Sequence, residues 1–162
     1  MKTQIFIDMD GVVAKWNTNA SIEDTYKPGY FLHRESEEKV VRLIQLLTEN
    51  EYRIRILSAA YEEGTARADK NKWLLKHAVS APAIFVPYGR NKSDYIDRNE
   101  KSILIDDFSK NLREWETAGN TGIKFYNGIN GTKGTWDGYS IDHRMSTEKM
   151  YVIVKAVADS VS

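Results

Sequence analysis

The chain has 162 residues, with 23 lysines and arginines against 23 aspartates and glutamates, so its formal net charge is zero. This length suits one domain with a proper core, and the balanced charge gives no general argument for nucleic-acid binding. The sequence contains no cysteine, which excludes disulfides, thiol nucleophiles and cysteine-based zinc sites. Because neither a secretory signal peptide nor an apolar stretch of membrane-spanning length is found, we expect a soluble cytoplasmic protein without a membrane partner.

Two carboxylates follow the first apolar run. Residues 5–13 read Ile-Phe-Ile-Asp-Met-Asp-Gly-Val-Val, the pattern of a short buried strand that ends in two aspartates and a glycine. Residues two apart on a strand point the same way, so we expect Asp8 and Asp10 to lie together where the strand ends. Like charges side by side are costly unless a cation lies between them or one carboxyl is protonated. The pattern therefore indicates a metal site, or a nucleophile beside a general acid.

The next segment, residues 14–35, has no clear period and is rich in aromatic and turn-forming residues. One interpretation is a loop with short helical pieces whose rings pack on the domain. The other is a small cap inserted over the end of the first strand, because ligand pockets favour aromatic walls. In that case several rings can stack on the base or sugar of a substrate, namely those of Trp16, Tyr26, Tyr30, Phe31 and Tyr61.

Helical and extended patterns alternate through the rest of the chain. Helices are expected from a cap at Ser36 to about residue 50, over 64–77, over about 108–118 and from about residue 146, the last with a buried stripe of Met150, Ile153, Val157 and Val161. Strands are expected over 53–57, 83–86, 102–105 and 123–126, followed by a glycine-rich loop over 127–138. This order predicts a single domain over 1–162 with a three-layer α/β/α Rossmann-like fold, a parallel sheet covered by helices on both faces.

Polar residues follow the ends of four predicted strands. Ligands in such folds bind beyond the carboxyl ends of the strands, which here carry Asp8, Asp10, Ser58, Lys92, Asp106 and Asp107. Oxygen-only ligands favour magnesium, which is commonly held by carboxylates together with phosphate oxygens. Lys92, and Ser58 with the backbone N–H groups of Ala59 and Ala60 at a strand-to-helix turn, can bind phosphate oxygens. One aspartate can then attack phosphorus while the other protonates the leaving oxygen.

These residues resemble the motifs of the haloacid dehalogenase superfamily. Residues 8–13 match its D-x-D-G-[VT] signature, Ser58 resembles its second motif, Lys92 its third and Ile105-Asp106-Asp107 its fourth. The four motifs occur in the right order, and the resemblance covers residues 1–13 and 36–127. Because Asp10 is present, the resemblance implies phosphoryl transfer rather than dehalogenation.

The resemblance also implies a role for each matched residue. Asp8 is expected to be the nucleophile and a magnesium ligand, and Asp10 the general acid and then the base, with its backbone carbonyl on the metal. Ser58 and Lys92 are expected to hold the transferring phosphoryl group. The remaining magnesium ligands are expected to be Asp106 and Asp107, the latter directly or through water.

Within the superfamily the chain looks most like the 5'(3')-deoxyribonucleotidase type. The similarities are D-M-D-G-V, Arg90 two residues before Lys92, and the I-D-D ending. They imply a magnesium-dependent 5'-nucleotidase that acts on nucleoside monophosphates through an aspartyl-phosphate. The chain departs from that type in its shorter segment 14–35 and in Ser58-Ala59-Ala60, where the type has proline after Ser or Thr. Two alternatives stay open: a phosphatase for a larger substrate, such as a nucleic-acid end or a phosphoprotein, and a binding module without turnover.

Overall fold

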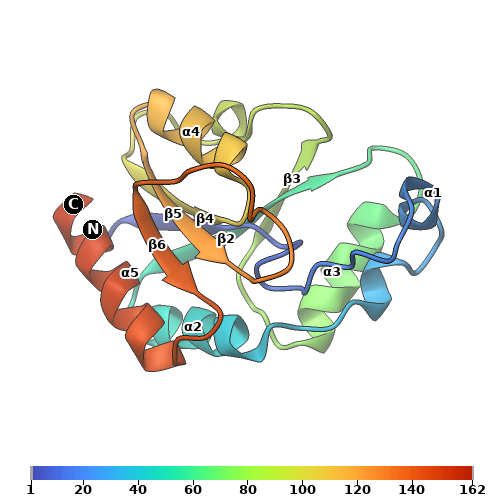
Figure 1. Ribbon diagram of the computed structural model, residues 1–162, viewed down its shortest axis with the longest axis horizontal. Helices are drawn as coiled ribbons and strands as arrows, with labels where there is room; N and C mark the ends of the chain where they lie inside the picture. Colours follow the sequence, from blue (N-terminus) through green and yellow to red (C-terminus); the bar gives the residue numbers. More distant parts are fainter. Residues whose placement is uncertain (1, 162) are drawn as a thin grey trace.

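The computed structural model describes residues 2–161, which are built around a six-stranded sheet (Figure 1). The strands are β1 Gln4–Ile7, β2 Arg53–Ala60, β3 Ala83–Pro87, β4 Ser102–Asp106, β5 Thr121–Tyr126 and β6 Tyr139–Asp142. The helices are α1 Ile22–Thr25, α2 Glu38–Glu49, α3 Ala66–Lys76, α4 Ser109–Thr117 and α5 Thr147–Val161, with the short 3-10 helices η1 Phe31–His33 and η2 Lys92–Tyr95. Figure 1 shows α1 and α3 at one end of the molecule, with β6 and α5 at the other.

The strands lie in the order β3-β2-β1-β4-β5-β6, and every neighbouring pair is parallel. β2 and β3 therefore follow β1 toward one edge of the sheet, whereas β4, β5 and β6 extend from β1 toward the other edge. The strand order reverses between β1 and β4, which pair from Gln4 opposite Ser102 to Ile7 opposite Ile105. Ligands in open α/β sheets bind at such a switch point, beyond the carboxyl ends of the strands.

Alternate residues of the central strands fill two cores on opposite faces of the sheet. Ile5 and Ile7 belong to the larger core, which contains the buried faces of α2, α3 and α5. Phe6 and Leu104 belong to the smaller core, where the ring of Trp115 in α4 meets Phe6 edge-on, with centroids 5.5 Å apart. Figure 1 shows α2 and α5 on one side of the sheet and α4 on the other. The three-layer fold that the sequence predicts is confirmed.

Two local predictions are wrong. The N-cap of α2 is Glu37, which makes no side-chain capping bond, while the hydroxyl of the expected cap, Ser36, donates to Glu38 Oε1. The second error is a missing strand, since β6 follows the glycine-rich segment 127–138. Only Ile141 of β6 is fully buried, so this edge strand lacks the apolar run that identifies the central strands.

The buried stripe of α5 also differs from the expected one. Met150 and Val157 are buried as predicted, whereas Ile153 and Val161 are only partly buried. Val154 and Ala158 take their places because steps of four residues from Met150 stay close to one helix face. Within residues 2–161, no helix combines the length and the apolar character that a bilayer crossing requires.

Candidate active site

Three carboxylates from two adjacent strands meet at the switch point. Asp8 directly follows β1, while Asp106 ends β4 and Asp107 follows it. One carboxylate oxygen from each lies within 4.8 Å of the other two, and all three residues are buried. This all-oxygen donor set fits a hard divalent cation such as magnesium.

Lys92, which opens η2 after β3, joins two of these carboxylates. Its Nζ lies 2.8 Å from Asp8 Oδ1 and 2.8 Å from Asp106 Oδ2. Asp106 also accepts hydrogen bonds from Asn111 Nδ2 and from the backbone N–H of Phe108. Burial alone would lower the pKa of Lys92, but the carboxylates of Asp106 and Asp8 outweigh burial and raise it. The ammonium therefore stays charged and holds Asp8 and Asp106 in place.

The pKa values of the cluster reflect its crowding. Burial raises the pKa of Asp8 to about 7, although the neighbouring Lys92 opposes the rise. Burial, with the charges of Asp8 and Asp106, raises the pKa of Asp107 to about 9. Three buried carboxylates repel one another, and a divalent cation bound among them would remove that repulsion.

The segment after β5 supports Asp107 from the other side. Asn130 Nδ2 donates to Asp107 Oδ2 at 2.6 Å, and Asn127 Nδ2 donates to the Gly11 carbonyl at 2.8 Å and also to Asn130 Oδ1. Gly11 has a φ of +86°, and a Cβ at this position would lie 2.1 Å from Asp107 Oδ2. The glycine of the D-x-D-G motif is therefore required both by its backbone conformation and by the space beside Asp107. The sequence analysis missed both asparagines, because a glycine-rich loop gives no periodic signal.

The carboxylate of Asp10 pairs with a different lysine. Lys70 Nζ donates to Asp10 Oδ2 at 2.6 Å, to the Ala59 carbonyl at 2.7 Å and to Ser58 Oγ at 3.1 Å. Lys70 is only 1% exposed, and its Nζ lies 4.3 Å from the centroid of the Phe31 ring. The two aspartates of the first motif thus contact two different lysines, Asp8 with Lys92 and Asp10 with Lys70.

Lys70 is a site residue that the sequence analysis missed. It lies on the stripe of α3 that includes Ala66, Trp73 and Leu74, all of which are buried. Because lysine is almost never fully buried unless it is paired, a lysine within an apolar stripe is the signal that identifies it.

The second motif lies within a strand, not at the expected turn. β2 continues to Ala60, and α3 begins only at Ala66, so the N–H groups of Ala59 and Ala60 are not at a helix N-terminus. Ser58 is fully buried and contacts Lys70. Its role in phosphate binding, like that of Ala59, stays a prediction.

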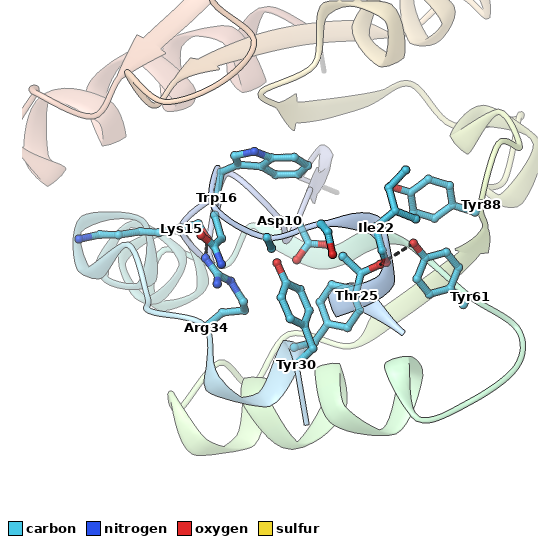
Figure 2. Close-up of a pocket in the computed structure, with 13 residues that line it drawn as sticks. Asp10, Lys15, Trp16, Ile22, Thr25, Tyr30, Arg34, Tyr61 and Tyr88 are labelled. Carbon is cyan, nitrogen blue, oxygen red and sulfur yellow. Dashed lines mark hydrogen bonds between the residues drawn. The ribbon is translucent and has the colours of Figure 1, made fainter. Parts of the chain in front are cut away.

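An aromatic pocket of about 240 Å³ lies beside Asp10 (Figure 2). Of the rings expected to contact a substrate, four line this pocket: Trp16, Tyr30, Phe31 and Tyr61. Tyr26 does not line it and instead stacks on Tyr61, with ring centroids 4.3 Å apart. Tyr88, which the sequence analysis did not single out, also lines the pocket. Its ring stacks on that of Tyr61, with ring centroids 5.1 Å apart. Figure 2 shows Asp10 amid these side chains, with Arg34 on one side and Tyr61 on the other.

A second pocket, of about 400 Å³, borders the carboxylate cluster. Two of its carboxylates, Asp8 and Asp107, line this candidate catalytic pocket together with Lys92. It shares Asp10, Trp16 and Tyr88 with the aromatic pocket, so the two hollows adjoin. A molecule with an anionic group near Asp8 can therefore extend among the aromatic rings.

Segment 14–35 is fastened to α3 by a buried aspartate. Asp69 Oδ2 accepts hydrogen bonds from the backbone N–H of Gly29 at 2.8 Å and from Thr65 Oγ1 at 2.8 Å. Trp73 Nε1 donates to the Arg34 carbonyl at 2.8 Å, near the end of the segment. These bonds hold one wall of the aromatic pocket on the helix.

The fold and the place of the cluster define a class: parallel α/β proteins of Rossmann-like topology with an acidic site at the switch point. No family model matches the sequence, and no curated protein matches it significantly. Among solved structures, the chain is similar to D,D-heptose 1,7-bisphosphate phosphatase from B. bronchiseptica complexed with magnesium and phosphate, with a TM-score of 0.66 and 13% identity over 97% of this chain and 99% of that chain. The corresponding enzyme from Burkholderia thailandensis has a TM-score of 0.58 and 15% identity over the same shares.

A third similar structure is a chain of the Pnkp1/Rnl/Hen1 RNA repair complex. Its TM-score is 0.60 at 12% identity, and the match covers 76% of this chain and 42% of that chain. At such low identities these similarities establish the shared fold.

Proposed function

We propose that this chain is a magnesium-dependent phosphomonoester hydrolase of the haloacid dehalogenase superfamily. The observation that carries the proposal is the buried cluster of Asp8, Asp106 and Asp107 at the switch point, with Lys92 bonded to the first two. The order of the four sequence motifs supports it, as does the fold shared with phosphatases, one of which is complexed with magnesium and phosphate.

In the proposed mechanism Asp8 is the nucleophile. Its carboxylate oxygen forms a bond to phosphorus while the bond from phosphorus to the leaving oxygen breaks, and Asp10 gives its proton to that oxygen. Water then attacks phosphorus, Asp10 takes up the proton of the water, and the bond between Asp8 and phosphorus breaks to release inorganic phosphate. Asp8, Asp106, Asp107 and the backbone carbonyl of Asp10 would hold the magnesium ion, whose positive charge would stabilise the transferring group. Lys92 holds Asp8 in place and can contact phosphate oxygens.

The proposed substrates are nucleoside 5'-monophosphates. With the phosphate beside Asp8, a nucleoside can extend into the adjoining aromatic pocket, where rings such as Trp16, Tyr30 and Tyr61 offer faces for stacking. Tyr26 backs the Tyr61 ring from outside the pocket. In this proposal segment 14–35 is a small cap, fastened to α3 by Asp69.

The test is phosphate release from p-nitrophenyl phosphate and from a panel of nucleoside monophosphates, with and without magnesium. We expect release to stop on chelation and to fall by at least about a thousandfold in Asp8→Asn, because that change removes the nucleophile. Asp137→Asn changes an exposed aspartate and serves as the matched control.

The substrate panel separates the alternatives. Release from 5'- or 3'-phosphorylated oligonucleotides but not from mononucleotides would replace the nucleotidase proposal with a phosphatase for nucleic-acid ends. Magnesium binding without release from any phosphoester would overturn the enzyme proposal and favour a binding module.

A further inference from the structure

A third hollow adjoins the catalytic pocket and is cationic. Its volume is about 530 Å³, and Phe108, Asn130 and Gly131 line both hollows. Among the described residues that line it there is no acidic side chain, while four are cationic: Lys110, Arg113, Lys124 and Lys133. We refer to this hollow as the cationic groove.

Lys124 is the buried cation of the groove. It lies in β5, is only 2% exposed, and its Nζ donates to Ser109 Oγ at 2.8 Å and to the Gly131 carbonyl at 2.9 Å. Both acceptors are neutral, and no carboxylate in residues 2–161 lies within ion-pair distance of its Nζ. Asp107 and Asp106 act on Lys124 only at longer range, and both belong to the catalytic cluster.

The other two lysines buried around the active site are paired differently. Lys70 holds Asp10 at 2.6 Å, and Lys92 holds Asp8 and Asp106 at 2.8 Å. A buried ammonium group without a counter-ion carries a large desolvation cost, so the environment of Lys124 favours the binding of an anion.

Further cations surround Lys124 at the rim of the groove. Arg113 is exposed, and its Nη2 donates a hydrogen bond to the Thr135 carbonyl at 2.6 Å. Lys133 is exposed on the glycine-rich segment. Neither side chain forms an ion pair within the part of the chain that the structure describes, whereas Lys110 is paired with Glu114 at 2.8 Å. Arginine guanidinium groups match the geometry of phosphate oxygens, and lysine binds them as a point charge.

A purely structural role for Lys124 explains only part of this arrangement. Its hydrogen bonds tie the segment after β5 to the start of α4, which any buried donor of suitable length would do. They do not explain why Arg113 and Lys133, without carboxylate partners, line the same hollow, nor why that hollow meets the catalytic pocket.

We propose that the cationic groove binds a second phosphate group of the substrate, while the phosphate to be removed lies beside Asp8. This inference rests on the proposed phosphatase function and extends its substrates from nucleoside monophosphates to molecules that carry a second phosphate group. Two sources share this chemistry: a small bisphosphate, such as a nucleoside 3',5'-bisphosphate, and the phosphodiester next to the terminal phosphate of an oligonucleotide. The groove takes no part in bond making and acts on substrate affinity.

The kinetic test compares a nucleoside 3',5'-bisphosphate, a 5'-phosphorylated dinucleotide, the 5'-monophosphate and p-nitrophenyl phosphate. We expect Arg113→Gln to raise KM about tenfold for the substrates with a second phosphate, because a charge-assisted hydrogen bond is lost, and to leave the other two unchanged. Arg98→Gln removes an exposed arginine outside the groove and should change none of them. Whichever of the bisphosphate and the dinucleotide has the higher kcat/KM identifies the source of the second phosphate. Equal effects of Arg113→Gln on all four substrates would overturn the inference.

A binding measurement separates this inference from the proposed reaction. Calorimetric titration of the bisphosphate into the Asp8→Asn protein, with and without Arg113→Gln, requires no turnover. About tenfold weaker binding in the double variant supports the groove even if the wild-type protein hydrolyses nothing, a result that would overturn only the enzyme proposal. Equal binding by the single and double variants would overturn the groove while leaving the phosphatase proposal untouched.

Discussion

At the scale of single residues, the carboxylate cluster couples cation binding to protons. Asp8 and Asp107 have pKa values of about 7 and about 9 in the folded chain, against an ordinary value of 3.8. A cation that binds their ionised forms must displace these protons, so its affinity depends on pH.

We therefore expect the apparent affinity for magnesium to rise with pH up to about pH 9 and to level off above it.

The stability of the metal-free protein should change with pH in the opposite direction. Because both folded pKa values are raised, the folded state binds protons more tightly than the unfolded chain, so this contribution to stability is full below about pH 4 and is lost as pH rises through about 7 and about 9. Calorimetric titration with magnesium and metal-free denaturant unfolding over this range test the two trends. A magnesium affinity that does not vary with pH would contradict the protonation of the cluster.

Gly11 is the second residue on which the cluster depends. In Gly11→Ala the new Cβ would meet Asp107 Oδ2, and the positive φ adds a strain of about 1–2 kcal/mol. We expect both lower stability and loss of magnesium binding, measured by urea unfolding and by calorimetry. Gly64→Ala is the matched control, since Gly64 has a φ of +78° but no atom within 4 Å of the added carbon. It should lower stability and spare magnesium binding, and equal loss of binding in both variants would refute the steric explanation.

At the scale of elements, the attachment of segment 14–35 to α3 shapes the aromatic pocket. The segment contributes only short helices, and its buried anchor Asp69 lies on the neighbouring helix, 40 residues from Gly29 in the chain. The stability of this wall therefore depends on a side-chain bond rather than on the helical propensity of the segment itself.

Asp69→Ala should free the Gly29 amide and loosen the segment. We expect faster hydrogen exchange across residues 14–35 and a decrease of about 1–3 kcal/mol in the free energy of unfolding. The substitution should also raise KM more for nucleotides than for p-nitrophenyl phosphate. Asp137→Ala, at an exposed position, is the control. If exchange in the segment stays at the wild-type rate, the bond from Gly29 to Asp69 does not hold segment 14–35 on α3.

At the scale of the whole molecule, stability depends on two cores of unequal size. The smaller core relies on Trp115, which is fully buried against Phe6 and whose indole N–H has no partner within residues 2–161, so apolar packing is its contribution. Trp115→Ala should lower the free energy of unfolding by about 3–5 kcal/mol, measured by urea denaturation. Trp16→Ala, which removes a tryptophan that is 40% exposed, should cost much less. A loss in Trp115→Ala as small as that expected for Trp16→Ala would mean that the packing of Trp115 adds little to the stability of the folded state.

Sequence patterns alone predicted the arrangement that brings Asp8, Lys92, Asp106 and Asp107 together. Each of these residues follows or ends a strand that its own neighbours identify, and the carboxyl ends of parallel strands share one edge of the sheet. Local periodicity was therefore sufficient to place them. It failed for β6, whose edge position leaves a sequence with little apolar character.

Tertiary structure decided which of the buried charged side chains described here pair with an opposite charge and which do not. Lys70 reaches Asp10 across 60 residues of sequence, and Asn130 reaches Asp107 across 23. Lys124 lies in a strand whose pattern shows that it is half-polar but not that its ammonium is buried beside a groove. The sequence alone determined the sheet and the edge where the site lies, because those follow from short-range pattern. Burial, pairing and the shape of the hollows depend on contacts between segments distant in the chain, and so only the folded structure determines them.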